Sequence, residues 1–172
     1  MINPKAIWFT GLSGAGKSTL ANALAQALIE NGQKALVLDG DALRMSISHD
    51  LGFSDEDRAE QMRRVIALAK SHLDEGAFVI TSLISPFQKM RDLARETIGK
   101  ERFVEVYVNT PLIVCEERDP KGLYRKARLG LIRQMTGIDS AYEVPVNPEI
   151  IINTSTKTID QCLLDILKVM KN

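Results

Sequence analysis

The residues with the clearest chemical potential form a glycine-rich run near the start of the chain. Residues 11–18 read G-L-S-G-A-G-K-S and match the phosphate-binding pattern G-x-x-x-x-G-K-[ST]. In this pattern backbone N–H groups surround phosphate oxygens, the lysine reaches the terminal phosphates, and the last hydroxyl joins the Mg²⁺ shell. The run therefore predicts ATP or GTP binding by Gly11, Leu12, Ser13, Gly14, Ala15, Gly16, Lys17, Ser18 and Thr19.

Two carboxylates follow the second short apolar run, at residues 35–38. Asp39 and Asp41 would lie at the carboxyl end of a strand, which faces the ligand crevice when a sheet is parallel. One carboxylate there can orient an attacking hydroxyl, and we assign this catalytic role to Asp41. Asp39 can hold Mg²⁺ through water, together with Ser18. The alternative is that these acids cap the following helix, and Asp41 can do both.

Positive charge is needed around a transferred phosphoryl group, because the charge of that group spreads over its oxygens. Arg118 is predicted to contact ATP and to act in catalysis, and Lys121 follows it closely. A plain solvated helix face is the alternative for Arg63 and Arg64, and we expect it to hold for one of them. The candidates on the acceptor side are Arg44, Arg58, Arg63 and Arg64.

Short apolar runs alternate with longer stretches of helical periodicity, which predicts a parallel sheet with helices on both faces. We expect one α/β domain of the P-loop NTPase type over residues 1–172. Residues 119–148 depart from the pattern, because they contain several glycines, prolines and basic residues and show weak periodicity. We predict that this lid segment is a basic lid, open without nucleotide because its cations repel one another when no phosphate lies beneath them. The predicted strands are 6–10, 35–38, 78–82, 103–108 and 150–153, and the predicted helices are 17–29, 41–51, 55–75, 86–98, 111–118 and 158–171.

Composition narrows the class of partner. Lys plus Arg and Asp plus Glu each number 22, so the net charge is zero and a general nucleic-acid binder is excluded. No apolar run is long enough for a membrane span, and the first residues do not resemble a signal peptide. Cys115 and Cys162 lie in apolar helical patterns and are read as reduced core thiols. We therefore expect a cytoplasmic protein that binds small nucleotides, without a nucleic-acid polymer or a membrane as partner.

The motifs together resemble the adenylylsulfate kinase family along nearly the whole chain. The resemblance is carried by G-L-S-G-A-G-K-S-T at 11–19, D-G-D at 39–41 and D-L-G-F-S at 50–54. The most specific stretches are C-E-E-R-D-P-K-G-L-Y at 115–124 and T-G-I-D-S at 136–140. The resemblance implies transfer of the ATP γ-phosphate to the ribose 3′-hydroxyl of adenosine 5′-phosphosulfate (APS), with Mg²⁺. It also implies a homodimer.

Acceptor-site positions follow from the same resemblance. Phe53 would stack on the acceptor base, with Met135 on the opposite face. Ser85 occupies a position sometimes given to a phosphoserine intermediate, but direct in-line transfer needs no enzyme nucleophile, so we expect a substrate contact. The implied acceptor residues are Asp39, Asp41, Arg44, Phe53, Arg58, Gln61, Ile84, Ser85, Lys121, Met135 and Thr136.

Departures from the family pattern gather on the acceptor side. The family has K-G-F-T-G-I-D where residues 133–139 read R-Q-M-T-G-I-D, so Met135 replaces a phenylalanine. Ala42 stands where the family has asparagine. A second reading is therefore a sister kinase acting on a ribose hydroxyl of another nucleotide conjugate, such as cytidine diphosphoramidate. A third is a nucleotide-sensing module without catalysis, against which the intact Lys17 and Asp41 argue.

Overall fold

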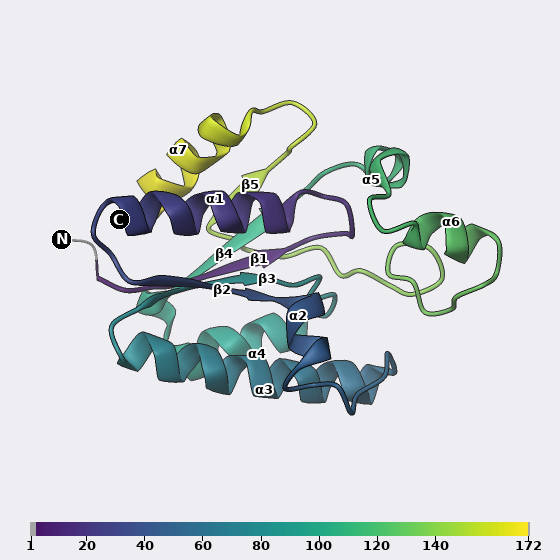
Figure 1. Ribbon diagram of the computed structural model, residues 1–172, viewed down its shortest axis with the longest axis horizontal. Coiled ribbons are helices and arrows are strands. Elements are labelled where there is room, and N and C mark those ends of the chain that lie inside the picture. Colours follow the sequence, from purple (N-terminus) through teal and green to yellow (C-terminus); the bar gives the residue numbers. More distant parts are fainter. Residues whose placement is uncertain (1–2, 172) are drawn as a thin grey trace.

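The sheet brings the candidate residues to one edge of the molecule. A computed structural model describes residues 3–171 and shows a five-stranded parallel sheet in the order β2-β3-β1-β4-β5 (Figure 1). Because every pairing is parallel, all carboxyl ends lie at the same edge, as predicted. The strands are β1 (Ala6–Thr10), β2 (Ala35–Asp39), β3 (Phe78–Ser82), β4 (Phe103–Val108) and β5 (Ile150–Ile152).

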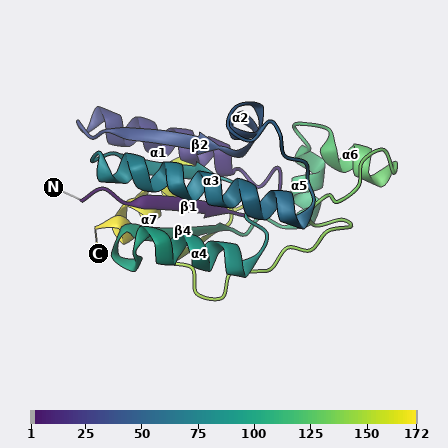
Figure 2. The same ribbon diagram turned by 90° about the horizontal axis from the view of Figure 1, so that it is seen from below.

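Helices cover both faces of the sheet. In Figure 1, α1 (Lys17–Glu30) and α7 (Ile159–Met170) lie above it, and α3 (Asp55–Asp74) and α4 (Gln88–Ile98) lie below it. Figure 2, seen from below, shows α3 and α4 running along the sheet. The shorter elements are α2 (Gly40–Met45), a 3₁₀ turn (Lys100–Arg102), α5 (Leu112–Arg118) and α6 (Leu123–Arg128). The single α/β domain expected from the sequence thus has its two predicted helical layers.

The alternation of side chains along β1 builds two cores. Ile7 and Phe9 pack with Leu24 in the layer below α1, whereas Trp8 packs with Val65 in the layer above α3. Every residue of β1 is buried, because a parallel sheet covered on both faces hides both sets of side chains. Both cysteines are buried free thiols, as expected. None of the helices between residues 3 and 171 combines the length and hydropathy that a membrane crossing needs.

Two predicted helices differ from the structure by two residues or more at one end, and the other four by a single residue at one or both ends. The helix expected over 41–51 ends at Met45, because the Ser46 hydroxyl donates to the Ala42 carbonyl and turns follow. The helix expected from residue 86 begins at Gln88, whose N–H donates to Glu143 Oε2 at 2.6 Å. Both differences come from side chains that satisfy helix ends, and one of those side chains is remote in sequence.

The lid segment is anchored to the domain and contains an unpredicted helix, α6. The side chain of Tyr124 is buried and its hydroxyl donates to the Ser13 carbonyl at 2.9 Å. We expected the basic residues here to repel one another, but Arg128 pairs with Glu116 at 2.6 Å and Lys121 pairs with Asp41. These acids offset part of the repulsion, which corrects the reason given for lid opening. Opening itself stays a prediction.

Candidate functional site

The glycine-rich run forms a loop between β1 and α1 that only glycine can build. Gly11 has φ +145°, and a Cβ on it would lie 2.6 Å from the Val108 carbonyl oxygen. Gly14 has φ +74°, and a Cβ there would lie 2.9 Å from the Cys115 oxygen. Gly16 precedes α1 and provides no side-chain cap, so the first N–H groups of the helix stay available to an anion.

Lys17 lies beneath this loop and carries a charge in a buried place. Only 8% of the residue is exposed, and its Nζ donates to the Leu12 carbonyl at 2.7 Å. Burial lowers the pKa of Lys17 to about 8, which keeps the ammonium largely charged at neutral pH. A phosphate placed against Nζ would supply the counter-charge that the surrounding protein lacks.

Asp39 serves two partners with its two oxygens. Oδ2 accepts from the Ser18 hydroxyl at 2.9 Å, and Oδ1 accepts from the N–H of Asp41 at 3.1 Å. Asp39 is therefore the N-cap of α2, and the capping role considered for Asp41 is wrong. The hydroxyls of Ser18 and Ser82 also lie 2.9 Å apart. Ser82 was missed from the sequence, although its place at the end of β3 was a signal for it.

Asp41 lies in the first turn of α2 and reaches across to the lid segment. Its carboxylate forms an ion pair with Lys121, and both side chains are about half exposed to solvent. Gln61 lies nearby on α3 and donates to the Gly40 carbonyl at 3.4 Å. The ion pair joins two residues that the sequence assigned separately to the acceptor side.

Arg118 holds the phosphate loop to the segment that follows β5. Its guanidinium donates to Thr154 Oγ1 at 2.8 Å, to the Thr154 carbonyl at 3.1 Å and to the Gly14 carbonyl at 3.3 Å. Thr154 also donates to the Ala15 carbonyl at 2.7 Å. Thr154 was missed from the sequence, because nothing in its own neighbourhood suggests a phosphate-loop contact.

Arg58 connects the turns after α2 with the lid segment. Its Nε donates to the Phe53 carbonyl at 2.9 Å, and its other nitrogens donate to Thr136 Oγ1 at 3.0 Å and to the Gln134 carbonyl at 2.7 Å. The Arg44 guanidinium lies 4.4 Å from the centre of the Phe53 ring and covers one face of it. Phe53 is 59% exposed, so its other face is free to stack on a base.

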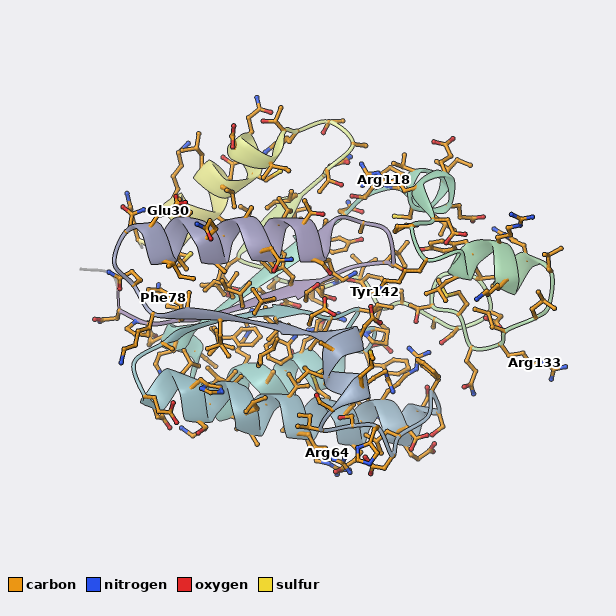
Figure 3. All side chains as sticks on the ribbon, in the orientation of Figure 1. Glu30, Arg64, Phe78, Arg118, Arg133 and Tyr142 are labelled. Carbon is orange, nitrogen blue, oxygen red and sulfur yellow. The ribbon has the colours of Figure 1, made fainter. Side chains whose placement is uncertain are left out.

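Arg63 and Arg64 do not belong to this site. Arg63 pairs with Glu60 on its own helix at 2.7 Å. Arg64 pairs with Asp50 through two contacts of 2.6 and 2.8 Å, and Figure 3 shows it at the lower edge of the molecule, far from Arg118. Neither arginine lines the cavity that joins the other candidates, so the helix-face reading fits both.

Ser85 faces the protein interior with its hydroxyl occupied. Trp8 Nε1 donates to Ser85 Oγ at 3.1 Å, and the residue is almost fully buried. The backbone of Ser85 has φ +45°, a conformation that only a surrounding network can hold in a residue other than glycine. This placement favours a positioning role over a nucleophilic one.

One continuous cavity of about 870 Å³ joins the phosphate loop to the acceptor side. Gly11, Leu12 and Ala15 do not line it, and their contact with ATP stays a prediction. Lys157 and Thr154 line it in addition to the predicted residues. The predicted residues that line it are Ser13, Gly14, Gly16, Lys17, Ser18, Thr19, Asp39, Asp41, Arg44, Phe53, Arg58, Gln61, Ile84, Ser85, Arg118, Lys121, Met135 and Thr136.

Comparison with known proteins agrees with this geometry. The family model described as adenylylsulphate kinase matches residues 3–153. Adenylyl-sulfate kinases of Aeromonas salmonicida and Pseudomonas aeruginosa are 53% and 52% identical to the chain, over 98% of the chain and 86% of each relative. The solved APS kinase of Mycobacterium tuberculosis, in complex with AMPPNP and APS, is 44% identical and has a TM-score of 0.95, with 100% of both chains covered. The chain therefore belongs to the adenylylsulfate kinase family of P-loop phosphotransferases.

Proposed function

We propose that the chain transfers the γ-phosphate of ATP to the 3′-hydroxyl of APS and releases ADP and 3′-phosphoadenylyl sulfate. The observation that carries this proposal is the single cavity, which holds a phosphate loop at one end and an aromatic and arginine cluster at the other. Two nucleotides can thus meet end to end within one enclosure. The sequence identity of 44% to an APS kinase that was solved with AMPPNP and APS supports the same arrangement.

On the ATP side, backbone N–H groups and two cations receive the phosphates. Lys17 faces the β- and γ-phosphates from beneath the loop, and Arg118 covers them from α5. Arg118 is held by Thr154, so its charge is fixed in place before the substrate arrives. Fixed positive charge lowers the barrier because it needs no reorganisation when the transition state forms.

Ser18 and Asp39 are the residues that would hold a magnesium ion. The hydroxyl of Ser18, the carboxylate of Asp39 and the hydroxyl of Ser82 converge here, and hard oxygen ligands are those that Mg²⁺ prefers. Within residues 3–171, no group of three or more His, Cys, Asp or Glu side chains could hold a metal by itself. Mg²⁺ bound here would neutralise charge on the β- and γ-phosphates, with water and phosphate completing its shell.

On the acceptor side, the Asp41 carboxylate accepts a hydrogen bond from the 3′-hydroxyl of APS. This hydrogen bond directs the 3′-oxygen toward the γ-phosphorus of ATP. The new bond joins the 3′-oxygen to phosphorus, the bond to the β,γ-bridging oxygen breaks, and the hydroxyl proton passes to the carboxylate. Lys121 forms an ion pair with this carboxylate, and its ammonium can also neutralise the negative charge of the acceptor's 5′ group. Phe53 stacks on the base, and Arg58 keeps the turn that bears Phe53 against the lid segment.

The test is ADP release measured with ATP, Mg²⁺ and APS, and with a panel of cytidine and uridine conjugates in place of APS. We expect turnover with APS and a product heavier by one phosphoryl group, and none when Lys17 is replaced by alanine. Turnover only with a cytidine conjugate would show that the chain is the sister kinase, which acts on another nucleotide conjugate. No ADP release with any acceptor would favour a nucleotide-sensing module. The homodimer stays a prediction, which light scattering can check on the same samples.

A further inference from the structure

Arg91 on α4 is a buried cation that the transfer mechanism does not use. Its residue is 1% exposed, and its Nε forms an ion pair with Glu105 Oε1 at 2.9 Å. Its two terminal nitrogens donate to the Ser85 carbonyl at 2.6 Å, to the Glu143 carbonyl at 2.7 Å and to the Gln88 side chain at 2.8 Å. A buried ion pair by itself contributes little to stability, so stability alone does not explain why Arg91 is buried here. The two carbonyl contacts point to another role for its side chain.

The first carbonyl belongs to the acceptor side of the cavity. Residues 84–86 follow β3 and line the cavity, and Ser85 holds its positive φ there. Arg91 donates a hydrogen bond to the carbonyl of Ser85, and Trp8 donates one to the hydroxyl of the same residue. The unfavourable backbone conformation is thus fixed by two hydrogen bonds from buried donors.

The second carbonyl belongs to the end of the lid segment that returns to the sheet. Glu143 donates its N–H to the Pro86 carbonyl at 2.8 Å. The hydroxyl of Thr10 donates to the Ile84 carbonyl at 2.7 Å, so the 2.9 Å contact with Tyr142 makes the tyrosine the donor. Figure 3 places Tyr142 beside the carboxyl ends of the strands.

We infer that Arg91 is a positioning residue, which locks residues 84–86 of the acceptor site to residues 142–143 at the base of the lid segment. Through these contacts one buried guanidinium sets the distance between residues 84–86, which line the acceptor side of the cavity, and residues 142–143 of the lid segment. This inference rests on the proposed function, because that function assigns residues 84–86 to the acceptor. Loss of the lock weakens acceptor binding and leaves the phosphate loop, which Arg91 does not touch, unchanged.

The matched test compares Arg91→Lys with Arg95→Lys. Arg95 lies one turn further along α4 and shares Glu105, but its other side-chain partners are Glu149 and the Phe103 ring, and it contacts neither carbonyl. Lysine keeps the charge and loses the forked donors. For R91K we expect the KM for APS to rise about tenfold with the KM for ATP within about twofold, as loss of charged hydrogen bonds predicts. For R95K we expect neither constant to change.

Hydrogen exchange on the protein without substrates gives a second readout that needs no activity. We expect faster amide exchange in residues 84–88 and 142–146 of R91K and not of R95K. If R91K does not fold, Glu143→Ala removes the exposed side-chain contact to Gln88 and should loosen the same two segments. If wild-type protein fails to use APS, the proposed function fails, and exchange alone decides the inference. Equal exchange and equal kinetics in folded R91K and R95K would overturn it.

Discussion

The two ends of the cavity are built in opposite ways. The phosphate end consists of backbone groups from one run of eight residues, with Lys17 buried below them and glycines at positions where any side chain would collide. The acceptor end consists of residues from α2, α3, the turns between them, the segment 84–86 and the lid segment. Arg58 joins two of these parts across 78 residues of sequence. A site built from contiguous backbone tolerates little change, whereas a site built from distant side chains can change one residue at a time.

The largest effect is expected at the phosphate end. Lys17→Ala should lower kcat by at least about 10²–10³-fold, because it removes fixed charge from the β- and γ-phosphates. The fold should survive, since the lysine side chain contributes one hydrogen bond and no apolar packing that the core needs. Initial rates of ADP release and the circular dichroism of the variant check this. A well-folded variant with normal kcat would contradict the role of the loop.

A substitution of Asp41 tests the place in the cavity where the acceptor hydroxyl is proposed to meet the γ-phosphate. Asp41→Asn should lower kcat roughly 10²-fold with little change in the KM for ATP, because the amide cannot accept the proton of the acceptor hydroxyl. Steady-state kinetics with each substrate varied in turn measures both constants. Collapse of ATP affinity instead would place Asp41 at the magnesium ion and remove it from proton transfer.

A pH experiment probes the buried charge at the phosphate end. The pKa of Lys17 is about 8 in the folded protein and near 10.5 when unfolded, so between these values the unfolded chain binds more protons. Stability without nucleotide should therefore rise with pH across this window, by up to about 10²-fold in the folding equilibrium relative to Lys17→Met. Denaturant unfolding of both proteins at pH 7.5 and 10 measures the difference. An unchanged difference would show that Lys17 is hydrated when no nucleotide is bound.

Arg58 isolates the acceptor end. Arg58→Lys should raise the KM for APS about tenfold, because it breaks the forked link between Phe53 and Thr136. The KM for ATP should stay the same, and Arg63→Lys on the same helix serves as the control outside the site. Similar changes in both KM values would mean that the two ends are not independent.

The smallest effect is expected at Met135. The family resemblance implies that Met135 lies opposite Phe53, so phenylalanine at this position should add a second aromatic face. Stacking worth about 1 kcal/mol should then lower the KM for APS roughly fivefold with kcat little changed. Met135 is 7% exposed and belongs to the hydrophobic cluster that contains Tyr124, so thermal melting is needed to show that the larger ring is accommodated. Reduced activity in a stable variant would indicate an acceptor with a smaller base.

How much was predictable from sequence follows the same division. The phosphate loop and β1, β3 and β4 were predicted with their bounds, because contiguous patterns determine them. The partners of Arg58, Ser85 and Arg118 could not be read, because each lies far along the chain or on the backbone. The exclusion of Arg64 depended on its pairing with Asp50 across 14 residues. Residue type indicated which side chains had chemical potential, and only the fold determined where they were directed.

The carboxylate of Asp39 allows the resting enzyme to become loaded with little motion. One oxygen caps α2 and the other receives the Ser18 hydroxyl. A metal ion held by the Ser18 hydroxyl would replace the contact of Ser18 with Asp39 Oδ2 and would leave the cap at Oδ1 in place. The helix that carries Asp41 would therefore keep its direction when the metal ion binds, and the reorganisation energy would stay local to the side chains of Ser18 and Asp39.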